Sequence, residues 1–457
     1  MASCGGTSTR TLPPSEEPGP EDPATPASAG SRLRAVFLES QDGIGVFRHF
    51  QDTELDLSCN FVASDAGVWR CLPEAPDATL TYEIVYTDPE CSQPRAALYG
   101  STVDSFACAL PRYVVLSSTC EEGPSVFELG SQVPSDVRYR LVEGVCSISS
   151  SGTDYLTSLF TVTPVSLELF QAGALQVGEE TGGIVPVDVR SDDGARVRLG
   201  FRDAQEGFDC FLPDTDEDVR CLPKDAGLMG YFFADSGCSQ PAAMAQSCAA
   251  ERGELAFAQE ISSGTTRYYQ ALARLPASYA GAPDRCAQDV NTIAFEVGSE
   301  VPITRFAAGQ RTDLSAGNLT TTVHTVGTAS LQATTLRSTA HGGHDCHFAL
   351  GADGELRCMP PPKRFPDNFF ADESCSQPVE YVREGILALD VSGACPEQVL
   401  VYARGDRYSG PVYAISDDGG CAFAYERPPG DSARSPYSVF PSPIPPSEFA
   451  PLFQVVR

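Results

Sequence analysis

A short cysteine-containing pattern occurs three times in this chain of 457 residues, and it constrains the fold more than any other feature. Each copy has an Arg-Cys-Leu-Pro or Arg-Cys-Met-Pro segment and, further on, a Cys-Ser-Gln-Pro segment. The Cys-Ser-Gln-Pro segments begin at Cys91, Cys238 and Cys375, 147 and 137 residues apart. Chance does not produce this regularity, so the chain contains an internal repeat of about 140 residues.

The repeat sets the expected domain boundaries. We expect a disordered tether rich in Pro, Ser and Glu over residues 1–31, followed by β repeats at 32–165, 166–310 and 311–457. The stretches that join consecutive repeats keep alternating apolar residues instead of becoming Pro- and Ser-rich. This pattern favours close packing of one repeat against the next.

Short apolar segments alternate with Gly, Pro, Asp and Ser, at roughly the 8–12-residue spacing that is typical of sandwiches, barrels and propellers. Residues 64–67 (Ser-Asp-Ala-Gly) and 352–355 (Ala-Asp-Gly-Glu) predict β-hairpin turns. No segment combines a helical period with capping residues. We therefore predict an all-β fold of three tandem, disulfide-stapled repeats in a propeller-like arrangement. Three β-domains in a row are the alternative.

The chain has 17 cysteines, a number that indicates disulfides formed in an extracytoplasmic compartment. Structural zinc, the alternative, usually has paired cysteines two to four residues apart, and no such pair occurs. Four positions recur in each repeat (the fourth being Cys120, Cys286 and Cys395), and their three possible pairings stay open. We expect Cys108 to pair with Cys146, and Cys248 to bridge to Cys421, unless these last two are free thiols. The candidates are Cys59, Cys71, Cys91, Cys108, Cys120, Cys146, Cys210, Cys221, Cys238, Cys248, Cys286, Cys346, Cys358, Cys375, Cys395 and Cys421.

Charge excludes two classes of partner. Acidic residues number 61 against 31 basic ones, a net charge of −30. Nucleic acids and anionic membrane surfaces both need clustered Lys and Arg, so neither is an expected partner. No run of 18 apolar residues occurs, so no segment is expected to span a bilayer as a helix.

Two clusters invite a metal-site interpretation. Asp214, Asp216 and Asp218 alternate as calcium ligands do, but the glycine and the distal glutamate of an EF-hand loop are absent, which favours an acidic, solvated hairpin tip. His341, His344 and His347 lie close to Cys346 in the sequence, and we expect this cysteine to be oxidised, which favours an exposed loop over a metal site. Calcium is therefore the only cofactor that the sequence raises.

Catalytic motifs are missing from the sequence: it has no Gly-x-Ser-x-Gly elbow, no phosphate loop and no His-Glu-x-x-His. Asp88, Asp235 and Asp372 recur three residues before the Cys-Ser-Gln-Pro cysteines, as a triplicated active residue would. A turn in which each aspartate orients the nearby cysteine is the simpler interpretation. Residues 404–406 (Arg-Gly-Asp) lie where the repeat places a post-strand glycine, so we give them no adhesive role.

Taken together, the repeated motif resembles the uncharacterised cysteine-repeat lipoproteins of GC-rich Gram-negative bacteria, over most of residues 32–457. The small residues before Cys4 and the Gly-Gly after it resemble the mature end of a bacterial lipoprotein, in which that cysteine carries the lipid. An unpaired thiol in a tail is the alternative. The resemblance implies a lipid-anchored or secreted envelope location and no known activity.

We therefore expect a non-enzymatic, surface-tethered binding or envelope-associated module with a protein or glycan partner. Its only expected membrane contact is the N-terminal lipid. A secreted, glycan-directed hydrolase on a propeller scaffold is the alternative, and a purely structural spacer is a third interpretation. An enzyme should bring carboxylates or histidines together in one pocket.

Overall fold

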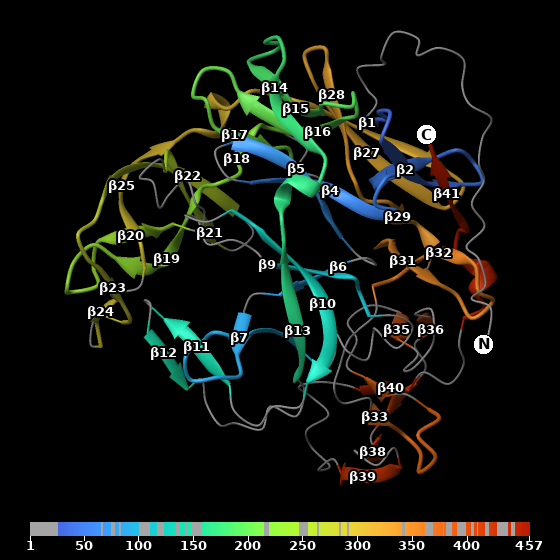
Figure 1. The fold of residues 1–457 in the computed structure, drawn as a ribbon. Helices are drawn as coiled ribbons and strands as arrows, with labels where there is room; N and C mark the ends of the chain where they lie inside the picture. The colour runs from blue at the N-terminus through green and yellow to red at the C-terminus, as the bar shows by residue number, and fades with distance from the viewer. Residues whose placement is uncertain are drawn as a thin grey trace.

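The chain folds into β-strands, as a computed structural model shows (Figure 1). No α-helix occurs in the part of the chain that the structure describes, where the helical segments are short 3₁₀ turns: η2 (Leu167–Leu169), η3 (Ile303–Arg305) and η6 (Pro446–Glu448). The predicted all-β class is therefore confirmed. The structure describes residues 26–457 except 65–66, 75–77, 82–83, 100–109, 117–122, 134–137, 143–144, 149–156, 214–218, 246–254, 263–264, 283–284, 290–291, 341–342, 362–368, 378, 381–385, 391–398, 404–405, 409, 416–419, 427–436 and 440–443.

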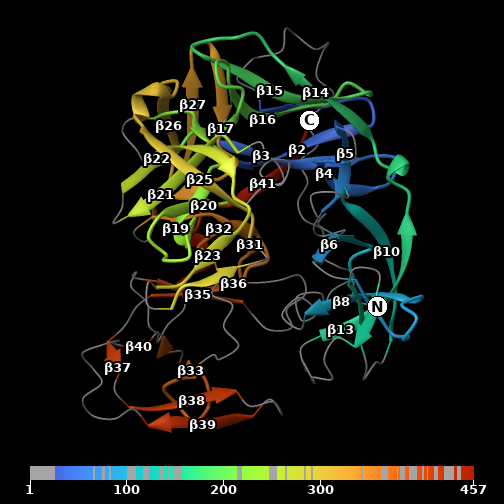
Figure 2. The same ribbon diagram turned by 90° about the vertical axis from the view of Figure 1, so that its left-hand side faces the viewer.

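A set of antiparallel strands drawn from all three repeats forms the upper part of the molecule in Figures 1 and 2, and we call it the inner ring. Its largest sheet crosses from repeat 1 to repeat 2, because β14 pairs with β5. The inner-ring strands are β1 (Ala27–Ser28), β2 (Leu33–Ser40), β3 (Gly45–Asp52), β4 (Leu57–Ala63), β5 (Val68–Pro73), β14 (Ala172–Val177), β15 (Ile184–Ser191), β16 (Arg196–Asp203), β17 (Asp209–Phe211), β18 (Leu222–Pro223), β26 (Gln310–Ala316), β27 (Leu319–Val326), β28 (Ala329–Gln332), β29 (Arg337–Ser338), β30 (His344–Asp345), β31 (His347–Leu350), β32 (Leu356–Met359) and β41 (Leu452–Val456).

The path of paired strands returns to its starting point. Single backbone bridges, Arg220 to Ala308 and Arg357 to Pro451, continue the path from repeat 2 to repeat 3 and from repeat 3 to β41. One residue separates β30 from β31, so these two short strands carry the path from β29 to β32. β41 then pairs with β2. The C-terminal strand therefore occupies, in repeat 1, the place that β14 and β26 hold in repeats 2 and 3.

Each junction between repeats is held by the arginine of the Arg-Cys segment. Its Nη1 donates to the carbonyl of a phenylalanine that follows a 3₁₀ turn, over 2.7–3.1 Å. The next residue, a cysteine, donates its amide to the carbonyl that follows the phenylalanine. Hydrogen bonds to charged groups contribute about 1.5–3 kcal/mol each. The pairs are Arg70–Phe170, Arg220–Phe306 and Arg357–Phe449, and each phenylalanine is 1% exposed.

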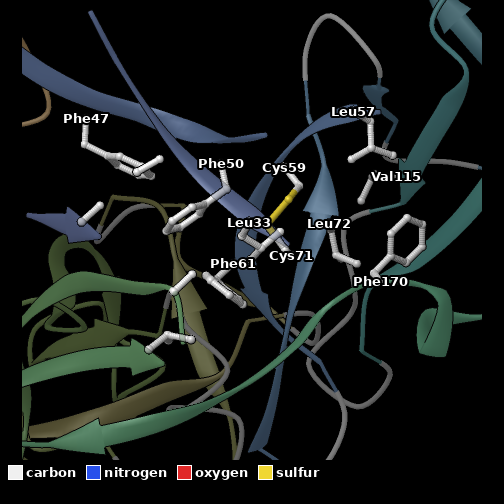
Figure 3. Close-up of a cluster of buried hydrophobic side chains, with 14 of the residues drawn as sticks. Leu33, Phe47, Phe50, Leu57, Cys59, Phe61, Cys71, Leu72, Val115 and Phe170 are labelled. Atoms are coloured by element: carbon white, nitrogen blue, oxygen red, sulfur yellow. A yellow bond between two sulfur atoms is a disulfide. The ribbon is translucent and has the colours of Figure 1, made fainter. Parts of the chain in front are cut away.

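Each repeat also contributes one peripheral group of strands outside the inner ring (Figure 2). The first packs against the ring through the apolar cluster around Phe50, where Val115 and Phe170 lie close to the disulfide between Cys59 and Cys71 (Figure 3). The peripheral strands are β6 (Ala78–Thr81), β7 (Ile84–Tyr86), β8 (Pro94–Tyr99), β9 (Tyr113–Leu116), β10 (Ser125–Val133), β11 (Tyr139–Val142), β12 (Val145–Ile148) and β13 (Thr157–Val165); β19 (Gly227–Phe233), β20 (Pro241–Met244), β21 (Phe257–Ser262), β22 (Thr265–Arg274), β23 (Ser278–Ala280), β24 (Ala287–Asp289) and β25 (Ala294–Val301); and β33 (Phe369–Phe370), β34 (Val379–Glu380), β35 (Ile386–Asp390), β36 (Val399–Ala403), β37 (Arg407–Tyr408), β38 (Pro411–Ile415), β39 (Cys421–Glu426) and β40 (Tyr437–Val439).

Two disulfides recur in every repeat. One joins neighbouring strands of the inner ring, and the other joins the Cys-Ser-Gln-Pro cysteine to a later peripheral strand or loop. Both therefore link segments that the fold already places side by side. The inner bridges are Cys59–Cys71, Cys210–Cys221 and Cys346–Cys358, and the peripheral bridges are Cys91–Cys146, Cys238–Cys286 and Cys375–Cys421.

The peripheral bridges correct three expectations. Cys421 pairs within its own repeat, so the proposed bridge from Cys248 is wrong, and Cys146 does not pair with Cys108. The equivalents of Cys286 are Cys146 and Cys421. Loops of unequal length hid this correspondence, because the peripheral bridges span 55, 48 and 46 residues. Cys4 and four further cysteine candidates lie outside the described residues: Cys108, Cys120, Cys248 and Cys395.

The Asp-x-x-Cys-Ser-Gln segment forms the same turn in each repeat. Asp372 Oδ1 accepts the amides of Ser376 and Gln377 at 3.0 and 2.7 Å, and its Oδ2 accepts the Ser376 hydroxyl at 2.7 Å. Cys375 takes a φ of +50°, which L-residues rarely adopt without such support. Asp88 and Asp235 make equivalent bonds, with Cys91 at +51° and Cys238 at +49°.

These bonds lower the pKa of all three aspartates. Desolvation is the largest single effect on Asp372 and raises its pKa, but bonds from Ser374, Ser376 and Gln377 outweigh it and hold the pKa at about 2. The Ser92 amide makes the largest contribution to the lowered pKa of Asp88, and the Gln240 amide to that of Asp235. The recurrent aspartates thus fix turns.

We predict that Arg357→Lys lowers the free energy of unfolding by about 2–3 kcal/mol, because a lysine ammonium cannot bridge the Phe449 carbonyl and two carboxylates at once. Urea denaturation of the oxidised protein, followed by circular dichroism, measures the loss. The control is Arg337→Lys, whose pair with Asp345 is more than half exposed and is worth at most about 1 kcal/mol. Equal losses in the two variants would contradict a special role for the junction arginine.

We predict that Asp372→Asn lowers the melting temperature near neutral pH, and that this deficit shrinks as the pH falls from about 4 towards 2. The folded-state pKa lies below the ordinary value of 3.8, so the carboxylate stabilises the fold above that value and loses this effect as it is protonated. Thermal melts of both proteins across this pH range provide the test. A deficit that is independent of pH would show that charge plays no part.

Candidate functional site

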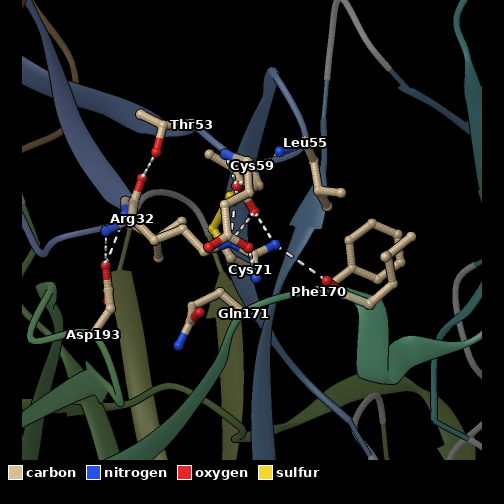
Figure 4. A network of polar contacts seen from close by, with 12 residues as sticks. Arg32, Thr53, Leu55, Cys59, Cys71, Phe170, Gln171 and Asp193 are labelled. Atoms are coloured by element: carbon tan, nitrogen blue, oxygen red, sulfur yellow. Dashed lines mark hydrogen bonds and ion pairs between the residues drawn. A yellow bond between two sulfur atoms is a disulfide. The ribbon is translucent and has the colours of Figure 1, made fainter.

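In repeat 1, an arginine occupies the position just before the first inner strand. The Arg32 guanidinium donates two hydrogen bonds to Asp52, from Nε to Oδ1 at 2.9 Å and from Nη2 to Oδ2 at 2.6 Å. Its Nη2 also donates to the Leu169 carbonyl at 3.1 Å. The Arg32 amide donates to Asp193 at 2.7 Å, and its carbonyl accepts the Thr53 hydroxyl at 2.8 Å (Figure 4). The site in repeat 1 is thus filled by the chain itself.

Backbone amides of the following turn fix Asp52, the buried partner of Arg32. Asp52 is fully buried, and its Oδ1 also accepts the amides of Glu54 and Leu55 at 3.0 and 3.2 Å. The hydrogen bond to Asp52 is the largest influence on Arg32 and raises the pKa of the guanidinium. A fixed carboxylate and a bidentate guanidinium therefore satisfy each other.

Repeat 2 carries glycine where repeat 1 carries Arg32. The Ala204 amide donates to the Gly183 carbonyl at 3.0 Å, as the Thr53 amide donates to the Arg32 carbonyl at 3.1 Å, which establishes the correspondence. Gly183 takes a φ of +88°, a conformation that side chains disfavour. No side chain from this position can therefore occupy the space that the Arg32 guanidinium takes in repeat 1.

The carboxylate persists in repeat 2. Asp203 ends β16 as Asp52 ends β3, is 5% exposed, and accepts the amides of Gln205 and Glu206 at 2.9 and 2.8 Å. Both bonds use Oδ1. No donor among the described residues reaches Asp203 Oδ2. The Asp203 carboxylate is thus held rigidly through Oδ1, while Oδ2 is not fully buried.

An open pocket of about 330 Å³ lies over this carboxylate. Asp203, Glu180 and Gly183 line it, and so does Arg305 at the end of η3, in the place that Leu169 has in repeat 1. Arg305 forms an ion pair with Glu206, so its charge is compensated locally. The arrangement presents a fixed hydrogen-bond acceptor of negative charge to an incoming cationic donor.

Repeat 3 has lost the charge pair. The Thr339 amide donates to the Asn318 carbonyl at 2.8 Å, which places Asn318 at the position of Arg32. Ser338, 1% exposed, replaces the aspartate, and its hydroxyl accepts the Ala340 amide at 3.2 Å. The three repeats therefore carry a filled, a vacant and an uncharged version of one site.

The sites predicted from sequence lie elsewhere. Asp214, Asp216 and Asp218 fall outside the described residues, as do Cys4 and residues 404–405. His344 packs its ring against Phe449 at 6.2 Å, within the fold. Among the residues that the structure describes, no three His, Cys, Asp or Glu side chains gather as a metal site requires.

Sequence reasoning did not identify Asp203 or Arg305. The repeat alignment rested on cysteines, and these residues lie outside the cysteine motifs. An alignment of the apolar segments that begin at Leu33 and Ile184 would have shown the exchange of arginine for glycine. Only the contact between Arg32, just before β2, and Asp52, at the end of β3, shows that the exchange removes the partner of a carboxylate.

Comparison with known proteins gives a family and no function. No curated protein and no solved structure matches the chain. As a separate structural finding, no helix in the described part of the chain is both long and apolar enough to cross a membrane. A family model described as a family of unknown function, DUF7481, matches residues 22–428. The chain therefore belongs to the DUF7481 family.

Proposed function

We propose that this protein is a non-enzymatic recognition module that works outside the cytoplasm and is tethered to the cell envelope through its N-terminal segment. The observation that carries the proposal is the pocket of repeat 2, in which a rigidly held carboxylate keeps one oxygen available to a ligand. The inner ring positions this carboxylate on paired strands instead of a free loop. Such preorganisation favours binding, because little freedom remains to be lost.

The six disulfides in the described part of the chain support the location. Bridges of this number are typical of secreted and envelope proteins, since cytosolic thiols are kept reduced. The structure shortens the predicted tether over residues 1–31, because Ala27 and Ser28 pair with β16. The residues between Cys4 and position 26 would hold the ring away from the membrane at a distance of up to about 65 Å if extended. Lipid attachment at Cys4 belongs to this proposal.

The direction of the carboxyl pKa shifts favours binding over hydrolysis. A general acid of a glycan hydrolase needs a carboxyl group whose pKa is raised. Every shifted carboxyl pKa in the described part of the chain is lowered, and these groups cap turns or pair with arginine: Asp88, Asp193, Asp235, Asp313, Asp353 and Asp372. These groups lie outside the pocket. They serve the architecture.

We predict that the protein expressed in a lipoprotein-processing bacterium incorporates an alkyne-tagged fatty acid, and that Cys4→Ser abolishes this label. The thiol at position 4 is the only attachment point in the proposed anchor. In-gel fluorescence after click labelling and a membrane wash measures the outcome, with Cys71→Ser as the control that keeps the label. Label retained by the Cys4 variant would refute the anchor.

We predict that the oxidised full-length chain binds members of a blocked peptide library or an oligosaccharide panel saturably and returns them unchanged. Surface plasmon resonance measures the binding, and mass spectrometry of the recovered ligands after overnight incubation measures turnover. Cleaved glycosidic or peptide bonds would overturn the non-enzymatic assignment. A complete lack of saturable binding would overturn recognition.

A further inference from the structure

We infer that the pocket of repeat 2 binds the guanidinium group of an arginine residue in a peptide or protein partner. The inference rests on the proposed function and names the ligand class of its site. The partner's arginine would occupy the space that Arg32 fills in repeat 1 and would pair with Asp203 as Arg32 pairs with Asp52.

The first support is the state of Asp203. It is 5% exposed, yet its Oδ2 has no donor within the described chain, while Oδ1 is anchored by two backbone amides. Oδ2 is not fully buried, so a ligand in the pocket that Asp203 lines can reach it. A ligand that supplies N–H donors would bond there to a carboxylate that is already fixed in place.

The second support comes from inside the same molecule. In repeat 1 the corresponding carboxylate, on the corresponding strand end, accepts a forked pair of bonds from Arg32 Nε and Nη2. A guanidinium is planar and presents this fork, whereas an ammonium makes point contacts. Gly183 removes the side chain without removing the carboxylate, so repeat 2 keeps a site whose shape and charge suit a guanidinium.

The acidic side chains of the pocket favour a cationic ligand that carries no carboxylate of its own. Glu180 adds a second acidic side chain to the pocket, and the positive charge of Arg305 is paired with Glu206. The chain as a whole carries a charge of −30, which attracts ligands of net positive charge. Free arginine has the same net charge of +1 as a blocked arginine peptide, but it would bring an α-carboxylate close to Asp203 and Glu180, and a blocked peptide has no such group.

The test compares three blocked tripeptides that differ only in the central residue: acetyl-Gly-Arg-Gly-amide and its citrulline and lysine counterparts. Citrulline matches arginine in shape but has no charge. Isothermal titration calorimetry and ligand-observed saturation-transfer NMR with the oxidised full-length chain measure the affinities. We expect the arginine peptide to bind at least about tenfold more tightly than the citrulline peptide, and more tightly than the lysine peptide.

The variant Asp203→Asn tests whether the peptide binds in the pocket that Asp203 lines. An asparagine oxygen can still accept the two backbone amides, so the end of β16 should persist while the charge is lost. We expect at least about tenfold weaker binding of the arginine peptide. The matched control is Asp192→Asn, the same charge change at an exposed residue outside the pocket.

Equal binding of the arginine and citrulline peptides to the unaltered protein would overturn the inference without reference to any variant. Binding that Asp203→Asn leaves unchanged, in a protein with a normal melting temperature, would overturn the location. Tighter binding of free arginine than of the blocked peptide would overturn the peptide source. If oligosaccharides bind while all three peptides fail, the recognition function stands and this inference falls.

Discussion

Closure of the strand path by the chain's last strand is the interaction on which the rest of the structure depends. Each repeat supplies inner strands, but the strand that precedes repeat 1 in the ring comes from the C-terminus, where β41 pairs with β2. The ladder narrows to single bridges at two junctions, Arg220 to Ala308 and Arg357 to Pro451. At these two junctions the arginine side chains add hydrogen bonds to phenylalanine carbonyls where the backbone supplies few. Because β41 pairs with β2, the edge of β2 is not available for pairing with another chain.

The two kinds of disulfide act at different levels of this architecture. The inner bridges join cysteines only 11 or 12 residues apart in the sequence, so they constrain short loops. The peripheral bridges close loops of 46 to 55 residues and are therefore expected to restrict the unfolded chain more. The aspartate turns explain why the Cys-Ser-Gln-Pro sequence recurs unchanged. Cysteine at positive φ needs a backbone cage, and the aspartate accepts bonds from the serine and glutamine that follow.

Repetition also explains how a binding site could arise without any new framework. The strand ends that hold Asp52 and Asp203 are built alike, with amides of the following turn fixing one oxygen of each carboxylate. In repeat 1 the other oxygen is satisfied within the chain. In repeat 2 the other oxygen of Asp203 has no bond from the described chain, and the carboxylate lines a pocket. In repeat 3 a serine, Ser338, takes the place of the carboxylate. A single glycine thus replaces a structural ion pair with a pocket whose carboxylate is open to a ligand.

The sequence by itself determined the all-β class, the threefold repetition and the turn role of Asp88, Asp235 and Asp372, because hairpin turns and Asx turns depend on residues close together in the chain. It also marked the Cys59–Cys71 type of bridge as a recurrent pair of positions. Only the tertiary structure decided that Cys91 joins Cys146, that consecutive repeats share a sheet, and that β41 closes it. Those contacts join residues tens to hundreds of positions apart, and loops of unequal length hide their register. The pocket beside Asp203 belongs to the same class, since the effect of replacing Arg32 with Gly183 becomes visible only when the neighbours in space are known.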